Sequence, residues 1–465
     1  MTSHPFSASS WLLAIAVATG SQVATAQQAI TLEQAVMMAQ QNDPWLHGNR
    51  LKQQAIENKS VASGALPDPQ VSLGLMNLPV DTWEFEQEGM TQVKVGVTQM
   101  FPRGDSLQLK QSQLALESSQ YPLLRANRKA QLQSKVSELW LDAYLAQRTI
   151  ELIKGDRALF EQIAEVAMIS YSNVIGKTRQ QDVIRAELEI VQLEDRLTVE
   201  KQKLDTLLAQ LNEWLHIYDK DEFAITFDDN PSTFAFEVSN QLPTLQLLNA
   251  ELLKASDYSR QRLAGELAYH PALMAIDVKQ QVSEKGVQLA EQSYKPQWGV
   301  NASYGYRGDM PSGDSRADFF SVGVTFDLPI FTENNQDKQV AASVAESESV
   351  KTEKLLLLKQ MISAVEKELK QLKRLSDRKA LYGELLLKQT QEQAEASLNA
   401  YTNDDGDFAE VVRARIAVLN ARISALNIDV NLLKTVARIN YFMARYQPQQ
   451  QTNSQSIPTY RIGEE

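Results

Sequence analysis

Two long stretches of the chain carry apolar residues at the three- and four-residue spacing of a coiled coil. One lies at residues 136–153 and the other at residues 412–433. Because a repeat of 3.5 residues keeps one face of a helix against a partner, both stretches predict long helices that pack in pairs. The apolar positions are Val136, Leu139, Ala143, Ala146, Ile150 and Ile153 in the first stretch, and Val412, Ile416, Leu419, Ile423, Leu426, Val430 and Leu433 in the second.

The helical composition extends well beyond these apolar positions. Only Pro122 and Gly155 interrupt residues 107–172, and only Gly383 interrupts residues 334–400. Helices of about 65 residues would reach on the order of 100 Å, which is far longer than a globular core requires.

The long helices are expected to reverse direction at two turns, residues 171–177 and 401–407. Each turn offers a glycine for positive φ beside polar residues that can cap a helix. The sequence therefore predicts two long antiparallel helical hairpins in one chain.

Four shorter segments alternate apolar and polar residues with the period of a β-strand. They are residues 70–78, 91–101, 297–306 and 318–328, each near the roughly 9 to 11 residues that cross a bilayer at a tilt. A soluble sheet with one face on a core shows the same period. Aromatic residues near the strand ends, and a second face polar enough to hold a lysine and an aspartate, favour a transmembrane barrel with a wet interior.

Four strands cannot close a barrel, and open strand edges are not tolerated in lipid. The chain is therefore expected to oligomerise. Two copies would give eight strands around a filled interior, whereas three copies would give twelve strands with room for a channel. Small and polar inward residues favour the open version.

The chain contains an internal duplication. Residues 95–98 return at 322–325, a spacing of 227, and Gly155 matches Gly383 at a spacing of 228. A register held over about 130 residues with one slip indicates two copies of one unit. Each copy has the order helix, strand, strand, very long helix, turn, helix.

The change from helix to strand falls at the same place in each copy. In the first copy, Asp43 and Pro44 give a helix start, and this helix is expected to end at Pro67. Residues 64–75, GALPDPQVSLGL, then change to strict alternation, and residues 293–300 repeat the change in the second copy.

Composition narrows the class of protein. The net charge of −12 and the absence of a basic stripe argue against nucleic acid as a partner. The chain has no cysteine, so it can hold no disulfide, thiolate ligand or lipid anchor on cysteine. Residues 1–26 resemble a secretory signal that ends in Ala-Thr-Ala. No later stretch is expected to form an apolar helix long enough to span a membrane.

Together these features resemble the TolC family of outer-membrane efflux ducts, over nearly all of the mature chain. Residues 64–75 carry part of the resemblance, and NLPVDT with EGMTQVKVGVTQMFPRGDSLQLK is similar to the heavy-metal branch, the CzcC and CusC proteins. The resemblance implies a mainly α protomer with transmembrane β-strands. Three protomers would form a twelve-stranded barrel in the outer membrane and a long α-helical barrel in the periplasm.

The resemblance also implies the partners and the domain order. The partners are a periplasmic adaptor, an inner-membrane RND pump and outer-membrane lipid. The expected units are the signal peptide at 1–26, a first repeat at 27–213, an equatorial segment at 214–243, a second repeat at 244–445 and a polar tail at 446–465.

Three sets of site residues follow from the resemblance. Hairpin tips that contact the adaptor are expected at Val174, Ile175, Gly176, Lys177, Asp404, Asp405, Gly406 and Asp407. A periplasmic gate is expected at Asp182, Arg185, Glu410 and Arg413, and helix–strand joints at Pro69, Pro102, Pro296 and Pro329. The family often has two aspartates after the second tip, where this chain has Glu410 and Arg413, so an acidic ring survives at most in part.

No cofactor or resident metal is expected. After signal removal only His47, His216 and His270 remain, and their spacing is not that of metal ligands. No phosphate-binding loop or nucleophile elbow is present, which argues against an enzyme. The alternatives to a heavy-metal duct are a duct for drugs or other organic compounds and a periplasmic adaptor or coiled-coil scaffold. An adaptor would have one hairpin, whereas this chain has two.

Overall fold

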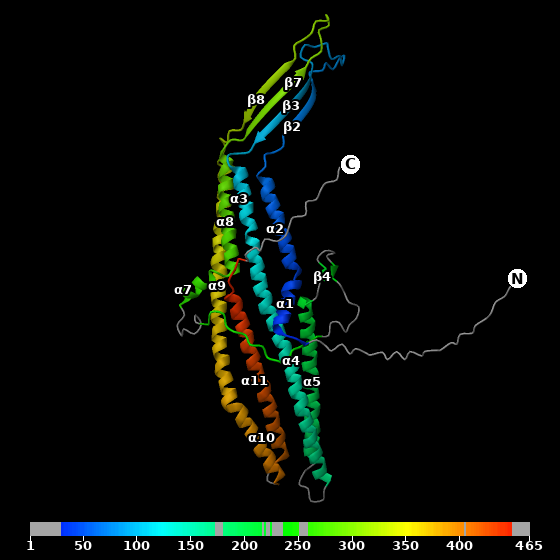
Figure 1. Ribbon diagram of the computed structural model, residues 1–465, viewed down its shortest axis with the longest axis vertical. Coiled ribbons are helices and arrows are strands. Elements are labelled where there is room, and N and C mark those ends of the chain that lie inside the picture. Colours follow the sequence, from blue (N-terminus) through cyan, green and yellow to red (C-terminus); the bar gives the residue numbers. More distant parts are fainter. Residues whose placement is uncertain are drawn as a thin grey trace, which may run out of the picture.

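The structure, a computed structural model, describes residues 29–172, 180–215, 218–219, 224–225, 236–250, 259–403 and 406–448. These residues form a long rod of helices with a β-sheet at one end (Figure 1). The expected signal peptide and most of the expected polar tail lie outside the described residues.

The sheet has four antiparallel strands in the order β2-β3-β7-β8. All four predicted strands are present, and each is shorter than predicted by one to three residues. For example, β2 ends before Leu78 because Asn77 has a φ of 54° and turns the chain. The strands are β2 (Gln70–Met76), β3 (Gln92–Phe101), β7 (Trp298–Tyr306) and β8 (Phe319–Phe326).

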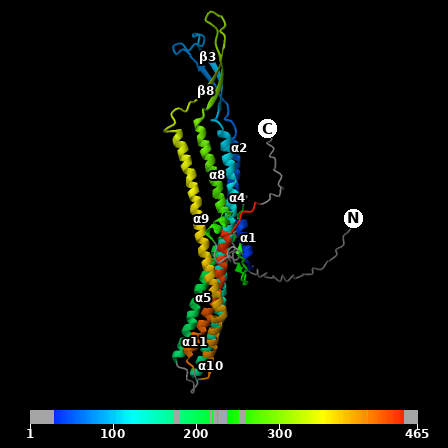
Figure 2. The same cartoon turned by 90° about the vertical axis from the view of Figure 1, so that its left-hand side faces the viewer.

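Four helices lie directly below the sheet in the same order as the strands. Helix α2 packs on α3, α3 on α8, and α8 on α9, so the helices form a single layer that continues the sheet (Figures 1 and 2). Each of these helices adjoins one strand in the chain. They are α2 (Pro44–Ser63), α3 (Ser106–Ser118), α8 (Pro271–Glu291) and α9 (Gln336–Leu381).

The far half of the rod contains the two predicted hairpins. Helix α4 (Gln120–Ser172) packs against α5 (Gln180–Leu215), and α10 (Leu387–Thr402) packs against α11 (Phe408–Phe442). Helix α11 also lies along α4 and α9, so the layer again has four members. The predicted apolar positions of α4 are all buried, as the coiled-coil spacing requires.

The two long helices are interrupted beside Pro122 and at Gly383, which are two of the three residues that break their helical composition, whereas α4 continues through Gly155. Ser119 separates α3 from α4, and Pro122 lies in the first turn of α4, where a proline lacks the N–H that a continuous helix would use. In the second copy a single π turn, Tyr382–Leu386, separates α9 from α10 and includes Gly383.

Short elements cover one face of the layer midway along the rod. Helix α1 (Leu32–Asn42) begins with a capping box formed by Thr31 and Gln34. It packs on α4 and α5, near two short strand pairs, β1 (Ala29–Ile30) with β6 (Glu237–Val238) and β4 (Tyr218–Asp219) with β5 (Ala224–Ile225), whereas α7 (Arg260–Leu267) packs on α9 at the other edge of the layer (Figure 1). The indole N–H of Trp140 donates to the Ile30 carbonyl at 2.9 Å, which fastens this cover to α4. We refer to the covered side as the outer face.

Helices meet end to end in both copies. Asn42, before α2, donates from Nδ2 to the Leu215 carbonyl at the end of α5, at 3.0 Å. Asp43 then caps α2, as predicted, by accepting from the Trp45 N–H. In the second copy His270 caps α8, and its Nε2 lies 3.0 Å from the Tyr441 carbonyl at the end of α11. Positions 43 and 270 are 227 residues apart, so they correspond.

The first helix of copy one is shorter than predicted. Helix α2 ends at Ser63 rather than at Pro67, with Gly64 as its C-cap. A residue before proline is disfavoured in the helical region, and the chain between Gly64 and Pro67 already turns toward the strand.

Helix α11 departs from one prediction. By length and composition it could cross a membrane, although no such helix was expected after the signal segment. It packs along α4, α9 and α10 with many buried residues, which is the position of a core helix. Its apolar character is explained by this packing.

His270 makes the stability of the fold sensitive to pH. Its Nδ1 accepts from the Ala272 N–H, so the ring is neutral with its proton on Nε2, and burial lowers the pKa of His270 to about 4. Because the unfolded chain binds this proton near pH 6.5, stability should fall as the pH drops from 6.5 toward 4. The loss should be about 3 kcal/mol. Urea unfolding at several pH values measures it.

The matched variant for this prediction is His270→Asn, which keeps a capping side chain but does not titrate in this range. Its unfolding free energy should lack the fall between pH 6.5 and 4. An equal fall in the variant would assign the pH dependence to other groups.

Candidate functional site

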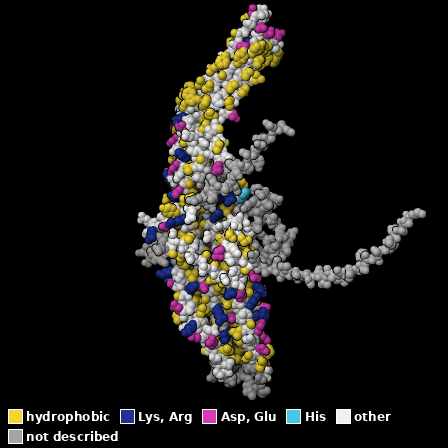
Figure 3. Space-filling view, viewed as in Figure 1, with side chains coloured by type: hydrophobic (Ala, Val, Ile, Leu, Met, Phe, Trp, Pro, Cys, Tyr) yellow, Lys and Arg dark blue, Asp and Glu magenta, His cyan; other side chains and the backbone are white. Residues whose placement is uncertain are grey.

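The sheet has one apolar face and one small, polar face. Cross-strand register places Leu73 beside Val95, Val95 beside Tyr304, and Tyr304 beside Phe320, in one row across all four strands. The side chains of this row are exposed, with Leu73 at 76% and Phe320 at 73%. Figure 3 shows the resulting yellow surface over the sheet. An apolar surface of this extent marks a lipid or protein contact.

The opposite face carries small and polar residues. The row next to the apolar one places Ser72 beside Gly96, Gly96 beside Ser303, and Ser303 beside Ser321. A Cβ on Gly96 would come within 2.7 Å of the Ser72 hydroxyl, so the side chains beside Gly96 leave no room for a larger residue there. The alternation predicted from the sequence therefore separates an apolar side from a wettable one.

The two outer strands, β2 and β8, each pair on one side only within the described residues. Their other edges present backbone N–H and C=O groups without a strand partner. Such edges are templates for pairing with another chain, and lipid does not tolerate them unpaired.

The loops at the far end of the sheet are tied to each other. The Arg307 guanidinium donates to the Gly89 carbonyl at 3.0 Å, and Arg316 donates to the Glu86 and Glu88 carbonyls. These hydrogen bonds hold the loop after β2 against the loop after β7 at the far end of the sheet.

The predicted joints lie where the helices meet the sheet. Pro69 immediately precedes the first residue of β2, and Pro296 lies two residues before the first residue of β7. Pro102 immediately follows β3, and Pro329 lies three residues after the end of β8. None of the four lies inside a strand, where proline would remove a ladder hydrogen bond. Next to Pro296, the Gln297 N–H donates to the Asp327 carboxylate at 2.6 Å, which ties the start of β7 to the end of β8.

A group of charged side chains connects the two repeats of the chain where the helices meet the sheet. Arg103 donates to the Lys295 carbonyl at 2.8 Å and pairs with the Asp327 carboxylate. Lys295 in turn pairs with Asp105 at 3.1 Å. The turn after β3 is thereby fixed to the start of β7.

The hairpin ends are described in part. Val174, Ile175, Gly176, Lys177, Asp404 and Asp405 lie outside the described residues. Asp407 caps α11 by accepting from the Ala409 N–H at 3.2 Å. A Cβ on Gly406 would lie 2.6 Å from the Tyr401 backbone nitrogen, so this turn requires glycine.

The predicted gate residues differ in exposure. Glu410 and Arg413 are exposed on the first turns of α11, and the Arg413 Nε donates to the Ala409 carbonyl of its own helix. Arg185 is exposed on α5, whereas Asp182 is buried. Three of the four predicted gate residues are thus exposed to solvent, whereas Asp182 is buried.

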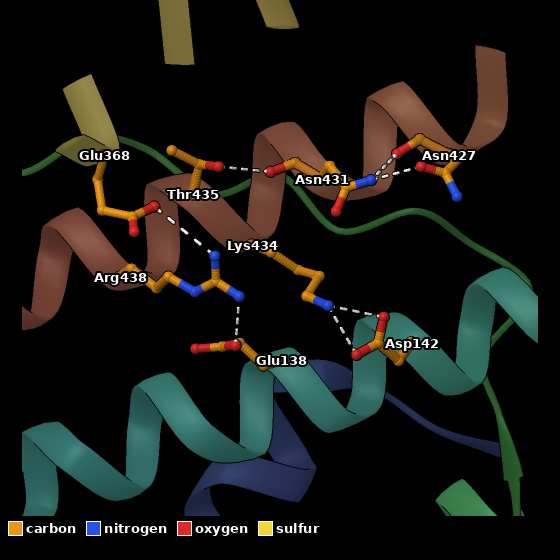
Figure 4. Close-up of polar contacts among 8 residues, drawn as sticks. All are labelled: Glu138, Asp142, Glu368, Asn427, Asn431, Lys434, Thr435 and Arg438. Carbon is orange, nitrogen blue, oxygen red and sulfur yellow. Dashed lines mark hydrogen bonds and ion pairs between the residues drawn. The ribbon is translucent and has the colours of Figure 1, made fainter. Parts of the chain in front are cut away.

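A polar cluster that the sequence analysis did not identify joins α4, α9 and α11 (Figure 4). Lys434 lies 2.7 Å from both carboxylate oxygens of Asp142. Arg438 bonds the Glu138 carboxylate at 2.7 Å and lies 3.7 Å from Glu368. The hydrogen bond to Glu138 is the main cause of a raised pKa at Arg438, which stays cationic.

The cluster lies away from the outer face. Trp140 contacts the cover, and Glu138 and Asp142 are each two residues from it, or about 200° around the helix. On α11, Asn440 bonds the Gln246 carbonyl of the cover, and Arg438 again lies two residues away. The side of the layer opposite the cover therefore carries these charges.

The sequence contains a signal for this cluster. Glu138 and Asp142 are four residues apart on one helix, and Lys434 and Arg438 are four apart on another. In an antiparallel pair of helices the first acid meets the second base and the second acid meets the first, as observed.

Metal ligation finds no support in the described residues. Among them no three His, Asp or Glu side chains converge as a metal site would require. Of the methionines in or near the strands, Met76, Met90 and Met310 are exposed, whereas Met100 packs beside Gly299.

No family model and no curated protein sequence matches the chain. Solved structures do match. The structure of CusC, described for its conformational changes on folding and transmembrane channel formation, is 13% identical, with 89% of this chain and 92% of that chain covered and a TM-score of 0.67. The outer membrane protein VceC of Vibrio cholerae is 14% identical, covers 90% and 97%, and has a TM-score of 0.70.

The MtrE outer membrane channel of Neisseria gonorrhoeae, solved in its open state, is 12% identical, with 89% of each chain covered and a TM-score of 0.66. The protein therefore has the fold of an outer-membrane channel protomer. Within that class the fold is the TolC-like one, with the duplicated order of helix, strand, strand, helix, helix, and the fold predicted from the sequence is confirmed.

The polar cluster gives a prediction about stability. Arg438→Met should destabilise the fold by about 2 kcal/mol, because Glu138 would lose its charged hydrogen bond and Glu368, only 4% exposed, would keep Lys367 at 3.2 Å as its remaining cation. The double variant Arg438→Met with Glu368→Met should recover part of the loss. Urea unfolding measures both changes.

Arg374→Met serves as the control, since Arg374 and its partner Asp377, 3.3 Å away, are both exposed. An exposed pair of this kind contributes about 1 kcal/mol or less. A loss at Arg438 no larger than that at Arg374 would contradict the importance of the cluster.

Proposed function

We propose that the protein is the outer-membrane duct of a tripartite RND-type efflux system. It acts as a homotrimer, with its strands in the outer membrane and its helices in the periplasm of a Gram-negative cell. The observation that carries the proposal is a four-stranded sheet with an exposed apolar face and two open edges, continued strand by strand into a layer of helices.

Three copies satisfy the physical demands of this sheet. Joining β8 of one copy to β2 of the next pairs every edge and turns the apolar row of Leu73 and Phe320 toward lipid. The polar row of Ser72 and Ser303 then lines a water-filled interior. Because the helices follow the same order as the strands, the same closure extends the interior through the periplasm.

Such a duct performs no chemistry. It replaces lipid by a water-filled path, and the energy comes from an inner-membrane pump linked through a periplasmic adaptor. The hairpin tips, including Gly406 and Asp407, are the proposed adaptor contacts. Adaptor binding would favour one of two packings of the hairpins and so open the periplasmic end.

The proposed gate uses the exposed charges at the start of α11. Glu410 and Arg413 would form alternating rings in the trimer, with Arg185 at the corresponding place in the first copy. Asp182 is buried, and a carboxylate in the first turn of α5 is also favoured by the helix dipole. We therefore propose that Asp182 stabilises the helices that carry the gate and does not itself face the channel.

Heavy-metal cations are the proposed cargo. The support is the sequence similarity of NLPVDT and EGMTQVKVGVTQMFPRGDSLQLK to the heavy-metal branch. The TM-scores for CusC, VceC and MtrE differ by at most 0.04, so the cargo rests on these motifs and not on the fold. The metal passes through the duct as cargo.

Membrane insertion can be tested with two neighbouring residues of β8. Phe320→Arg places a charge on the apolar row and should cost about 2 to 4 kcal/mol in lipid, abolishing the trimer. Ser321→Arg, one residue on, faces the other side and should retain it. The measurement is a heat-sensitive trimer band from the outer-membrane fraction. Recovery of the wild-type chain as a soluble monomer would contradict the proposal.

The cargo can be tested by deletion of the gene and growth on a panel of metal salts, drugs and dyes. Loss of tolerance to one or more metals is expected, restored by the wild type but not by Phe320→Arg. Unchanged tolerance to every metal with lost tolerance to a drug would assign an organic cargo instead.

A further inference from the structure

Because of the internal duplication, each protomer has two corresponding turns between a strand and the following helix, one after β3 and one after β8. Among the described residues, only the turn after β3 packs against another segment of the chain, and we call this the filled joint and the other the open joint. In the filled joint, the turn after β3 packs on the segment before β7. Arg103 donates to the Lys295 carbonyl, and the Asp105 N–H donates to Gln292 at 3.1 Å. Both sides of this joint belong to the same chain.

Among the residues that the structure describes, none covers the apolar side chains of the corresponding turn after β8. Adding 227 to Arg103 and Gly104 gives Ile330 and Phe331, which are 69% and 85% exposed. Leu328, at the position that corresponds to Phe101, is exposed as well. Three of the four residues from 328 to 331 are thus large apolar side chains in open solvent.

The surface that should receive this turn lies at the opposite edge of the chain. Subtracting 227 from Gln292 and Lys295 gives Ala65 and Asp68, in the segment before β2, and Leu66 between them is exposed. Since β2 and β8 are the two outer strands of the sheet, the turn after β8 cannot reach this segment in its own chain. A neighbouring copy would present it.

The side chains on the two surfaces are complementary in size. In the filled joint Gly104, which has a φ of 46°, faces long side chains, and a Cβ there would also clash with the side chains of Lys295 and Gln292. In the open joint the order is reversed, because Phe331 takes the place of glycine and Ala65 takes the place of Gln292. A large residue opposite a small one fills the same space.

The chemistry of the two joints also differs. The filled joint is ionic, through Arg103, Lys295, Asp105 and Asp327. At the corresponding positions of the open joint stand Ile330, Asp68, Thr332 and Met100, so three of the four charges are absent. Burial of Ile330 and Phe331 against Ala65, Leu66 and Pro67 would stabilise the assembled protomers and is not available to a single protomer.

We propose that residues 328–331 of each protomer dock on residues 65–68 of a second copy of this chain and form an apolar seam below the β8–β2 junction. The inference rests on the proposed trimer and adds the contact that closes it. The seam is continuous with the open edges of the sheet and lies at the level where helices take over from strands.

The absence of native cysteine allows a direct test by cross-linking. In the variant Leu66→Cys with Phe331→Cys, mild oxidation of outer-membrane fractions should link neighbouring protomers into covalent dimers and trimers that reductant reverses. A disulfide needs Cβ atoms within about 3.5 to 4.5 Å, so the reaction reports the docked geometry.

Two controls bracket the result. Each single-cysteine variant should remain uncrosslinked, because the seam pairs different residues. Leu66→Cys with Leu385→Cys should also remain uncrosslinked, since Leu385 is exposed but lies far from the sheet, between α9 and α10 (Figure 1).

A second measurement does not depend on disulfide geometry. Phe331→Asp should lower the temperature at which the trimer dissociates on a gel, whereas Val80→Asp, an exposed residue in the loop after β2, should leave it unchanged. A heat-sensitive trimer that is neither cross-linked at the cysteine pair nor weakened by Phe331→Asp would overturn the seam and leave the proposed function standing. The absence of any trimer in the outer-membrane fraction would overturn the proposed function itself.

Discussion

Unpaired backbone groups on the outer edges of β2 and β8 are the constraint on which the rest of the structure depends. A sheet with an exposed apolar face can enter lipid only when every strand edge is paired. That condition limits a four-stranded protomer to a role within a ring. The order of the helices follows from it, because each helix adjoins one strand and continues its position in the layer.

Duplication supplies this architecture with two units of the same shape and different chemistry. Asp43 and His270 occupy corresponding caps, yet one is charged and pairs with Arg128, while the other is neutral and bonds a carbonyl. At the sheet joints, Arg103 corresponds to Ile330 in the same manner. The two copies thus keep the same backbone arrangement at these positions while the side chains that stabilise it differ.

Most of the fold could be predicted because its signals are local. Coiled-coil spacing gave the hairpins, alternation gave the four strands, and the repeat gave their order. Contacts across the chain could not be predicted in this way. Arg438 and Glu138 are 300 residues apart, and their pairing depends on how α11 crosses α4. Likewise the cover formed by α1 and α7 depends on tertiary packing, and the burial of Asp182 depends on the packing around α5.

The π turn at Tyr382–Leu386 explains a detail of the sequence. A π turn holds one residue more than an α turn, and the spacing between the copies increases from 227 to 228 by Gly383, which lies in this turn. The second copy thus carries an additional residue without a longer hairpin, and α5 and α11 begin at corresponding positions, Gln180 and Phe408. A wider turn in one helix therefore takes up the additional residue before the hairpin ends, and the two copies stay in register at the starts of α5 and α11.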